Sequence, residues 1–381
     1  MNVLSLLSRT HPSHMVLFDV GSATIGVAVA KYHSGHPIEI LFTHREHIKY
    51  ADGTNVSDAL RVAIINAGKS VLEALGTLGH RRIGSYSVQA VVHAPWIDSY
   101  STRIESGLKE EVAISRALLQ KFMHDRLPKT SPPGRVQCDY HVTKIELNGY
   151  HTLDPFQKTA RHIALTVLQS TVAEKVHEAL RSAYSSVFPN HEVHIDSFLF
   201  AITQLQDAVA EHDSFSVLDV GGEYTTLHII QDGVAMGGVG IDFGTEHLLR
   251  AIMKGTNLDR HAALSELTMY LAKTCTPSQC SKIENSLKQM EIEWAQQFGD
   301  ACTTLSKTRR IPNALSLFGD TRLTQWFTHI LTRFEFATFT TTGQVFVATP
   351  LSFNNAQQEV VFHESAKTDN VLALLALFVD K

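Results

Sequence analysis

The sequence predicts an α/β protein with two similar halves that face each other across a cleft. The first observation is a near repeat: residues 16–22 and 216–222 both run from apolar residues into Asp-Val-Gly and a turn, 200 positions apart. A second strand-like run follows each copy, which is typical of a β-hairpin. The second observation is the alternation of strand-like and helical segments around both hairpins, which favours α/β layers.

The first half begins with three strand-like runs. Apolar runs bounded by Gly, Ser, His and Pro predict strands over residues 15–20, 25–31 and 38–43. Residues 55–78 carry apolar side chains at helical spacing, and residues 87–94 form another apolar strand that ends before a Pro-Trp pair.

The middle of the chain has a different character. Residues 103–186 predict a compact α+β insert, divided by the Pro/Gly break at residues 131–134. The predicted elements are a helix over 109–127, strands near 140–147 and 160–169, a helix over 171–185, a strand over 194–198 and a helix over 200–210.

The second half starts at the second hairpin, near residue 215. A long amphipathic stretch over 276–298 places Ile283, Leu287 and Trp294 at helical spacing, which favours a core-facing stripe over a partner-binding groove. The other predicted elements are a mainly helical region over 245–307, a strand over 314–318, a helix over 323–334, a strand over 346–350 and a helix over 370–379.

Composition narrows the class of protein. Hydrophobic residues make up 44% and charged residues 19%, as in globular proteins, and the net charge of -5 does not favour a nucleic-acid partner. The longest apolar run, residues 371–379, is too short to span a bilayer. Four scattered cysteines form no CxxC pair and no dense disulfide framework, which favours a reducing, cytoplasmic setting.

Two further features leave alternatives open. Residues 1–10 include Val3, Leu4, Leu6 and Leu7, which predict either a turn packed on the body or a short helix in peripheral contact with a membrane. The 21 histidines include pairs with i,i+3 spacing, but no pair has a carboxylate third ligand on a convincing helix, so we expect surface histidines rather than a metal site.

The repeated hairpins, with a strand-Gly element about 100 residues after the second copy, resemble the actin-like ATPase superfamily. This superfamily includes Hsp70, hexokinase and actin, and its two α/β domains flank a nucleotide cleft. The hairpins of Asp19 and Asp219 resemble its two phosphate loops, and residues 315–320 take the place of its adenosine motif.

The insert narrows this resemblance to the FtsA/PilM type, the cell-division protein FtsA and the type IV pilus assembly protein PilM. These proteins carry an SHS2 subdomain at the same position in the chain. Asn148-Gly149-Tyr150 leading to Asp154-Pro155 is similar to that subdomain, and residues 241–249 resemble the family's Gly-containing turn into a helix.

The resemblance implies an actin-like (ribonuclease H-like) two-domain fold around a nucleotide cleft. It assigns residues 1–14 to an N-terminal extension, 15–102, 187–214 and 341–381 to the first domain, 103–186 to the SHS2-like insert, 215–244 and 311–340 to the second domain, and 245–310 to a reduced helical subdomain.

The resemblance also implies a site for ATP and Mg²⁺. In this fold two aspartates hold Mg²⁺ through water, glycines let the backbone approach the phosphates, and hydroxyls and backbone N–H groups donate hydrogen bonds. The matching residues are Asp19, Gly21, Ser22, Thr24, Asp219, Gly221, Gly222, Thr225, Thr226, Gly244 and Gly319.

Three residues depart from the family pattern. Glu223 and Tyr224 stand where the second phosphate loop has glycine and threonine, and Asp320 stands in the glycine run of the adenosine motif. A carboxylate beside a phosphate site lowers its affinity for the anion. No residue matches a water-positioning base, and the family's Glu-x-x-Lys pair is missing.

We therefore expect a bacterial scaffold of the FtsA/PilM type that binds ATP weakly or not at all and is at most a weak ATPase. It would organise a cell-division or type IV pilus assembly complex with protein partners at the inner membrane, with self-association into filaments as a further option. The alternative is an ATP-dependent small-molecule kinase of the same superfamily. An Hsp70-like chaperone is disfavoured, since no substrate-binding domain accompanies the fold.

Overall fold

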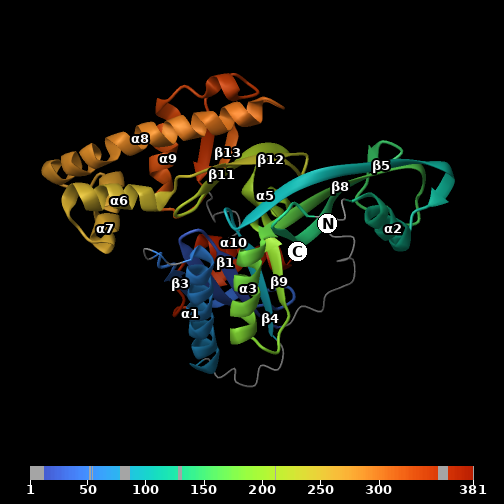
Figure 1. Cartoon of the computed structure of the whole chain (residues 1–381), viewed down its shortest axis with the longest axis horizontal. Helices are drawn as coiled ribbons and strands as arrows, with labels where there is room; N and C mark the ends of the chain where they lie inside the picture. The colour runs from blue at the N-terminus through green and yellow to red at the C-terminus, as the bar shows by residue number, and fades with distance from the viewer. Residues whose placement is uncertain are drawn as a thin grey trace.

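The computed structural model describes residues 13–50, 53, 55–77, 86–127, 131–210, 212–350 and 359–380. The prediction for residues 1–10 therefore lies outside the described residues. Two central sheets organise the body, and Figure 1 shows the first below, the second above and the insert projecting to one side.

The first sheet has six strands. They are β1 (His14–Val20), β2 (Thr24–Lys31), β3 (Ile38–His47), β4 (Tyr86–Val92), β9 (Val193–Ser197) and β15 (Val360–Phe362). Their order is β15-β3-β2-β1-β4-β9. The β1–β2 hairpin is antiparallel, whereas β4 runs parallel to β1 on its other side.

The second sheet repeats this plan. Its strands are β10 (Ser214–Val220), β11 (Thr225–Gln231), β12 (Val234–Ile241), β13 (Ala314–Phe318) and β14 (Val347–Pro350). Their order is β12-β11-β10-β13-β14, with an antiparallel β10–β11 hairpin and β13 parallel to β10. The predicted pair of similar α/β halves is confirmed, and each half is called a lobe below.

Helices cover the lobes. Those of the first lobe are α1 (Val56–Thr77), α3 (Glu174–Val187), α4 (Phe198–Gln204), α5 (Gln206–Val209) and α10 (Asn370–Asp380). Those of the second lobe are α6 (Thr245–Thr256), α7 (Arg260–Leu271), α8 (Pro277–Ser306), α9 (Thr324–Arg333) and the 3₁₀ turn Ala337–Phe339. Figure 1 shows α1 and α3 side by side.

Strand alternation sends the two faces of β1 to different cores. Val16 and Phe18 pack under α1 and α3, whereas Met15 and Leu17 join a core with α4, α10 and residues of β10. From the second lobe Phe215 enters that same core, so it lies between the lobes. The stripe of α8 is buried at Ile283, Leu287 and Trp294, as predicted for core.

The insert is a four-stranded antiparallel sheet covered by one helix. It comprises β5 (Ile97–Ala113), β6 (Arg135–Leu147), β7 (Tyr150–His151), β8 (Thr159–Ala173) and α2 (Arg116–Arg126), in the strand order β5-β8-β6-β7. Leu119 and Met123 of α2 pack on Val142 and Leu165 of the sheet.

Two predicted elements of the insert are wrong in part. Residues 109–113 form the end of β5 rather than helix, because Val112 pairs with Ala160 of β8. The helix predicted over 171–185 corresponds to α3. It packs on α1 and the first sheet, so it belongs to the first lobe and not to the insert. The insert sheet thus occupies residues 97–173, compared with the predicted 103–186.

The C-terminal segment is shared between the lobes. Strand β14 pairs with β13 of the second sheet, although residues 341–381 were predicted to return to the first domain. Among the described residues of this segment, β15, which pairs with β3, and helix α10 belong to the first lobe. The chain therefore completes the second sheet before it crosses back.

The cysteines behave differently from expectation in one respect. Cys275 and Cys280 are joined by a disulfide that closes the turn between α7 and α8, a pairing that the sequence analysis missed. Among the described helices, none combines the length and the apolar composition needed to cross a lipid bilayer.

Candidate functional site at the junction of the two hairpins

The two aspartates of the repeat meet between the lobes. Asp19 follows Met15 and Leu17 on the face of β1 that looks toward the second lobe, and Asp219 lies at the matching position of β10. Both side chains are buried. The period of two residues along a strand thus turns two distant Asp-Val-Gly segments toward one point.

His93 bridges these aspartates. Its Nε2 lies 2.8 Å from Oδ1 of Asp19, and its Nδ1 lies 2.7 Å from Oδ2 of Asp219. The ring also stacks on Phe198, the first residue of α4, at a centroid distance of 4.1 Å. Each ring nitrogen therefore contacts one carboxylate, Nδ1 through a hydrogen bond and Nε2 through an ion pair, which matches a charged imidazolium.

The electrostatics agree with a charged histidine. Burial alone would lower the pKa of His93, but Asp219 and Asp19 outweigh burial and raise the pKa to about 10. Burial opposes ionisation of Asp19, yet Arg45 and His93 hold the pKa of Asp19 at about 2. The bridge is an ion-paired network over the physiological pH range.

Arg45 supplies a second cation to Asp19. Its Nη2 lies 2.8 Å from Oδ2 of Asp19, and its Nε donates to Asp369 at 2.6 Å. A Cβ at Gly26 would lie 3.0 Å from the guanidinium carbon, so a glycine on β2 leaves room for the arginine. Arg45 also donates to Thr24 Oγ1 at 3.2 Å, so this predicted phosphate donor is an acceptor here.

The two predicted phosphate loops touch each other. A Cβ placed on Gly222 would lie 2.1 Å from the Cβ of Ala23, and one on Gly221 would lie 2.8 Å from Ser22 Oγ. Ser22 Oγ accepts a hydrogen bond from the backbone N–H of Glu223 at 3.0 Å. Glycine at 221 and 222 thus permits contact between the loops.

The start of α6 completes the second turn. Backbone N–H groups of Thr245 and Glu246 donate to the carbonyls of Gly221 and Gly222, at 3.1 and 2.8 Å. A Cβ on Gly244 would lie 2.3 Å from the Gly222 carbonyl oxygen. The helix amides that suit an anion are therefore engaged by the chain itself.

Glu223 is paired with a cation of the second lobe. Its carboxylate forms a paired contact with the guanidinium of Arg250 on α6, at 2.6 and 2.8 Å. Asp320 likewise pairs with Arg322 and accepts its backbone N–H at 3.0 Å at the start of α9. The two acidic departures from the family pattern thus have local ionic partners.

The remaining predicted residues have structural roles. Thr225 is buried and donates to the Phe243 carbonyl at 2.7 Å. Thr226 is buried on β11 opposite Gly240. Gly21 closes its turn by donating to the Thr24 carbonyl at 3.0 Å. Gly319 has φ 142° and a Cβ there would meet the Val220 carbonyl at 2.8 Å, so only glycine suits the position.

This arrangement does not fit a Mg²⁺–polyphosphate group. Both oxygens of Asp19 and one of Asp219 contact protein cations, and the loops that would cradle phosphates are in contact. Mg²⁺ requires oxygen ligands that are free to coordinate it or its waters. The cations His93 and Arg45 already supply the positive charge that Mg²⁺ would bring to Asp19 and Asp219.

Sequence reasoning predicted the two aspartates but missed their partners. His93 follows the apolar strand β4, whose parallel pairing with β1 sets Val92 beside Val20 and His93 beside the first turn. Arg45 lies in an extension of β3 beyond the predicted end at residue 43. The expectation of surface histidines is wrong for His14, for His93 and for His141 of the insert, which are buried.

Known proteins resemble this chain in fold but not in overall sequence. No protein-family model matches this sequence, and a search of curated proteins found no match. A solved structure described as a "PilM-PilN type IV pilus biogenesis complex" has a TM-score of 0.60 at 14% identity, over 96% of this chain and 98% of that chain.

Two other solved structures are similar at lower scores. Ethanolamine utilization protein EutJ from Carboxydothermus hydrogenoformans has a TM-score of 0.44 at 15% identity, over 87% of this chain and 86% of that chain. A Bacteroides thetaiotaomicron protein with an actin-like ATPase fold has a TM-score of 0.38 at 10% identity, over 96% of both chains. The repeated sheet topology and the similarity to the PilM-PilN structure over almost the full chain give this protein an actin-like two-domain fold.

Proposed function

We propose that this protein is a non-catalytic scaffold of the PilM kind, whose lobes are held together by its own ion pairs rather than by a nucleotide. The observation that carries the proposal is the Asp19–His93–Asp219 bridge. It joins the strand ends of the two lobes and neutralises the carboxylates that the superfamily uses for Mg²⁺.

The similarity in fold supports a role in a pilus-assembly complex. The PilM-PilN complex contains a protein that matches this chain over almost its full length, insert included. We infer that this chain has a comparable role. It binds the cytoplasmic segment of a membrane-bound pilus-assembly partner, and this partner recruits it to the inner membrane.

The insert offers a surface for such a partner. Tyr100 on β5 and Tyr140 on β6 are both opposite Gln169 of β8, so they lie in one row across the sheet. Their exposed fractions are 39% and 46%. Exposed tyrosines are common anchors in protein interfaces, because they bury a large area at low entropic cost.

The test is binding to a counterpart of PilN from the same organism. Purified full-length chain is titrated calorimetrically with that protein's cytoplasmic segment, using wild type and the double variant Tyr100→Ser/Tyr140→Ser. We expect wild type to bind and the double variant to lose at least about tenfold in affinity, which is about 1.4 kcal/mol.

The matched control is Val62→Ser, which removes an exposed apolar side chain from α1, away from the insert. It should bind as tightly as wild type. The proposal is wrong if pilus-assembly proteins fail to bind wild type, or if ATP-dependent phosphorylation of a small molecule is found.

A further inference from the structure

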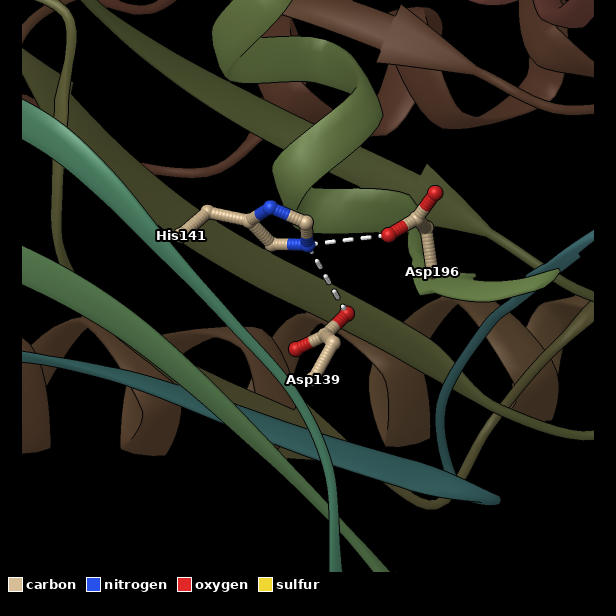
Figure 2. A group of neighbouring side chains, drawn as sticks. All are labelled: Asp139, His141 and Asp196. Atoms are coloured by element: carbon tan, nitrogen blue, oxygen red, sulfur yellow. Dashed lines mark hydrogen bonds and ion pairs between the residues drawn. The ribbon is translucent and has the colours of Figure 1, made fainter. Parts of the chain in front are cut away.

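A second Asp–His–Asp group joins the insert to the first lobe. Asp139 and His141 are two residues apart on β6, so both side chains leave the same face of the strand, and Asp196 lies near the end of β9. Figure 2 shows the imidazole of His141 directed toward both carboxylates. None of these residues belongs to a motif that is recognisable in the sequence.

The donor atoms converge on one point. Nε2 of His141 lies 2.9 Å from Oδ1 of Asp196 and 3.6 Å from Oδ2 of Asp139. Around a tetrahedral Zn²⁺, with bonds of about 2.0–2.2 Å, neighbouring donor atoms are about 3.3–3.6 Å apart. The distance to Asp139 falls in this range and the distance to Asp196 is shorter, while all three donor atoms lie within 4.8 Å of one another, so side-chain shifts of less than about 1 Å place a cation between them.

The geometry differs from that of His93. There, each ring nitrogen contacts a different carboxylate. At His141 the same nitrogen, Nε2, faces both Asp139 and Asp196. One N–H donates well to only one acceptor, so an imidazolium satisfies this group poorly, whereas a single cation bound to Nε2 contacts both carboxylates.

One buried polar atom of the group supports a bound ion. Oδ1 of Asp139 has no hydrogen-bond partner within the described residues, although Asp139 is only 9% exposed. Nδ1 of His141 also has no hydrogen-bond partner there, but it faces away from the carboxylates, and a cation at Nε2 leaves it unchanged. Orphaned polar atoms in a native interior call for an explanation such as an ion or a water. A cation bound by the triad, with a water on it, gives Asp139 that partner.

Charge balance favours a divalent ion. Among the described residues, the ion pairs of Asp139 and Asp196 are with His141 alone. With a protonated imidazole the buried group has a net charge of about -1, and with a neutral imidazole and a divalent cation it has none. Burial favours the neutral assembly.

The surroundings hold the three side chains in place. The Ser197 backbone N–H donates to Oδ2 of Asp139 at 3.1 Å, and Gln89 Nε2 donates to Oδ2 of Asp196 at 2.8 Å. The ring of His141 stacks flat on Phe200 at a centroid distance of 3.4 Å. Hydrogen bonds and packing of this kind orient the ligands of metal sites.

We propose that Asp139, His141 and Asp196 bind a divalent transition-metal cation, with Zn²⁺ the best match to one imidazole and two carboxylates. The fourth ligand is a water reached along the partly exposed side of Asp196. Mg²⁺ and Ca²⁺ prefer oxygen-only ligands and are excluded by the imidazole. The bound ion fixes the insert to the first lobe.

The experiment uses tag-free, full-length protein, because added histidines bind the same ions. Protein stripped with chelator is titrated calorimetrically with Zn²⁺ and with Mg²⁺, and Co²⁺ absorption reports imidazole-containing coordination. We expect one Zn²⁺ per chain, no Mg²⁺ binding, and affinity at least about 100-fold lower in His141→Ala and in Asp196→Asn.

Controls separate ligand loss from other effects. His151→Ala removes an exposed histidine from the same insert sheet and should bind Zn²⁺ like wild type. If His141→Ala does not fold, the near-isosteric Asp196→Asn and Asp139→Asn decide the question. The proposal is overturned if wild type binds no stoichiometric Zn²⁺, or if folded ligand variants bind it as tightly as wild type. Partner binding is measured separately and does not enter this result.

Discussion

Ser22 Oγ accepts a hydrogen bond from the backbone N–H of Glu223 at 3.0 Å, so a turn of the first lobe is in direct contact with a turn of the second. In a protein of this fold such a contact occupies the space between the hairpins. Together with the His93 bridge it means that the described structure closes on itself at the position of the cleft.

Close contact between the turns makes Gly222 sensitive to substitution. In Gly222→Ala the added Cβ would lie 2.1 Å from the Cβ of Ala23, so the lobes must separate or the turn must shift. We expect a loss of about 1–3 kcal/mol in the free energy of unfolding, measured in urea.

Gly76→Ala is the matched control for that substitution. A Cβ at this position of α1 meets nothing within 4 Å, and alanine is the better helix former. This variant should be as stable as wild type or more stable. Equal stability of Gly222→Ala and wild type would contradict the close contact.

Removal of the bridging imidazole should destabilise the protein strongly. His93→Ala leaves two buried carboxylates that face each other, with Arg45 as the one remaining cation paired with them among the described residues. Breaking a buried ion pair by removing one partner costs about 3–5 kcal/mol. Thermal and urea unfolding measure the loss, and His194→Ala, an exposed position on β9, serves as the control.

The same bridge predicts how stability depends on pH. The pKa of His93 is raised from 6.5 to about 10, so its contribution is complete below pH 6.5 and is lost as the pH rises toward 10. The pKa of Asp19 is lowered from 3.8 to about 2, so its contribution is complete above pH 3.8 and is lost as the pH falls toward 2.

Unfolding midpoints of wild type and His93→Gln across this range check the assignment. The stability difference between them should be largest between pH 3.8 and 6.5 and should shrink toward pH 10. Burial, offset only in part by Asp219, lowers the pKa of the neighbouring His228 to about 4, so His228 stays neutral during the alkaline loss. A constant difference up to pH 10 would rule out a charged His93.

Nucleotide binding should be absent or very weak. Calorimetric titration with ATP and Mg²⁺ is expected to give no saturable binding up to about 1 mM, because Asp19 and Asp219 are already paired with protein cations. Asp19→Ala should give the same trace. Saturable binding by wild type that is lost in Asp19→Ala would show a functional nucleotide cleft.

Local sequence patterns predicted the general plan of the fold. The Asp-Val-Gly hairpins, the amphipathic α1 and the long α8 are set by apolar periodicity and turn residues, and all three are confirmed. Residues 109–113 were mispredicted because Lys109, Glu110 and Glu111 favour helix, whereas Gly107 before them and Val112 after them both pair with β8, so this stretch lies at an irregularity within β5.

The two aspartates of the site could be predicted from the sequence, whereas their cationic partners could not, and the reason is physical. Asp19 and Asp219 belong to a local motif that recurs, whereas His93, Arg45 and Asp369 are isolated residues on other elements. Which cation meets which carboxylate depends on strand order and register across the sheet. The same holds for His141 and Asp196, which come from the insert and from the first lobe.

Helix α4 gives these two groups a common mechanical support. Ser197 caps the helix by accepting the Phe200 backbone N–H at 3.2 Å, Phe198 stacks on His93, and Phe200 stacks on His141. One short helix therefore contacts both bridging rings. We expect a swing of the insert to move Phe200 and, through α4, the Phe198 ring that packs on His93, so that the tilt of the insert and the gap between the lobes are coupled.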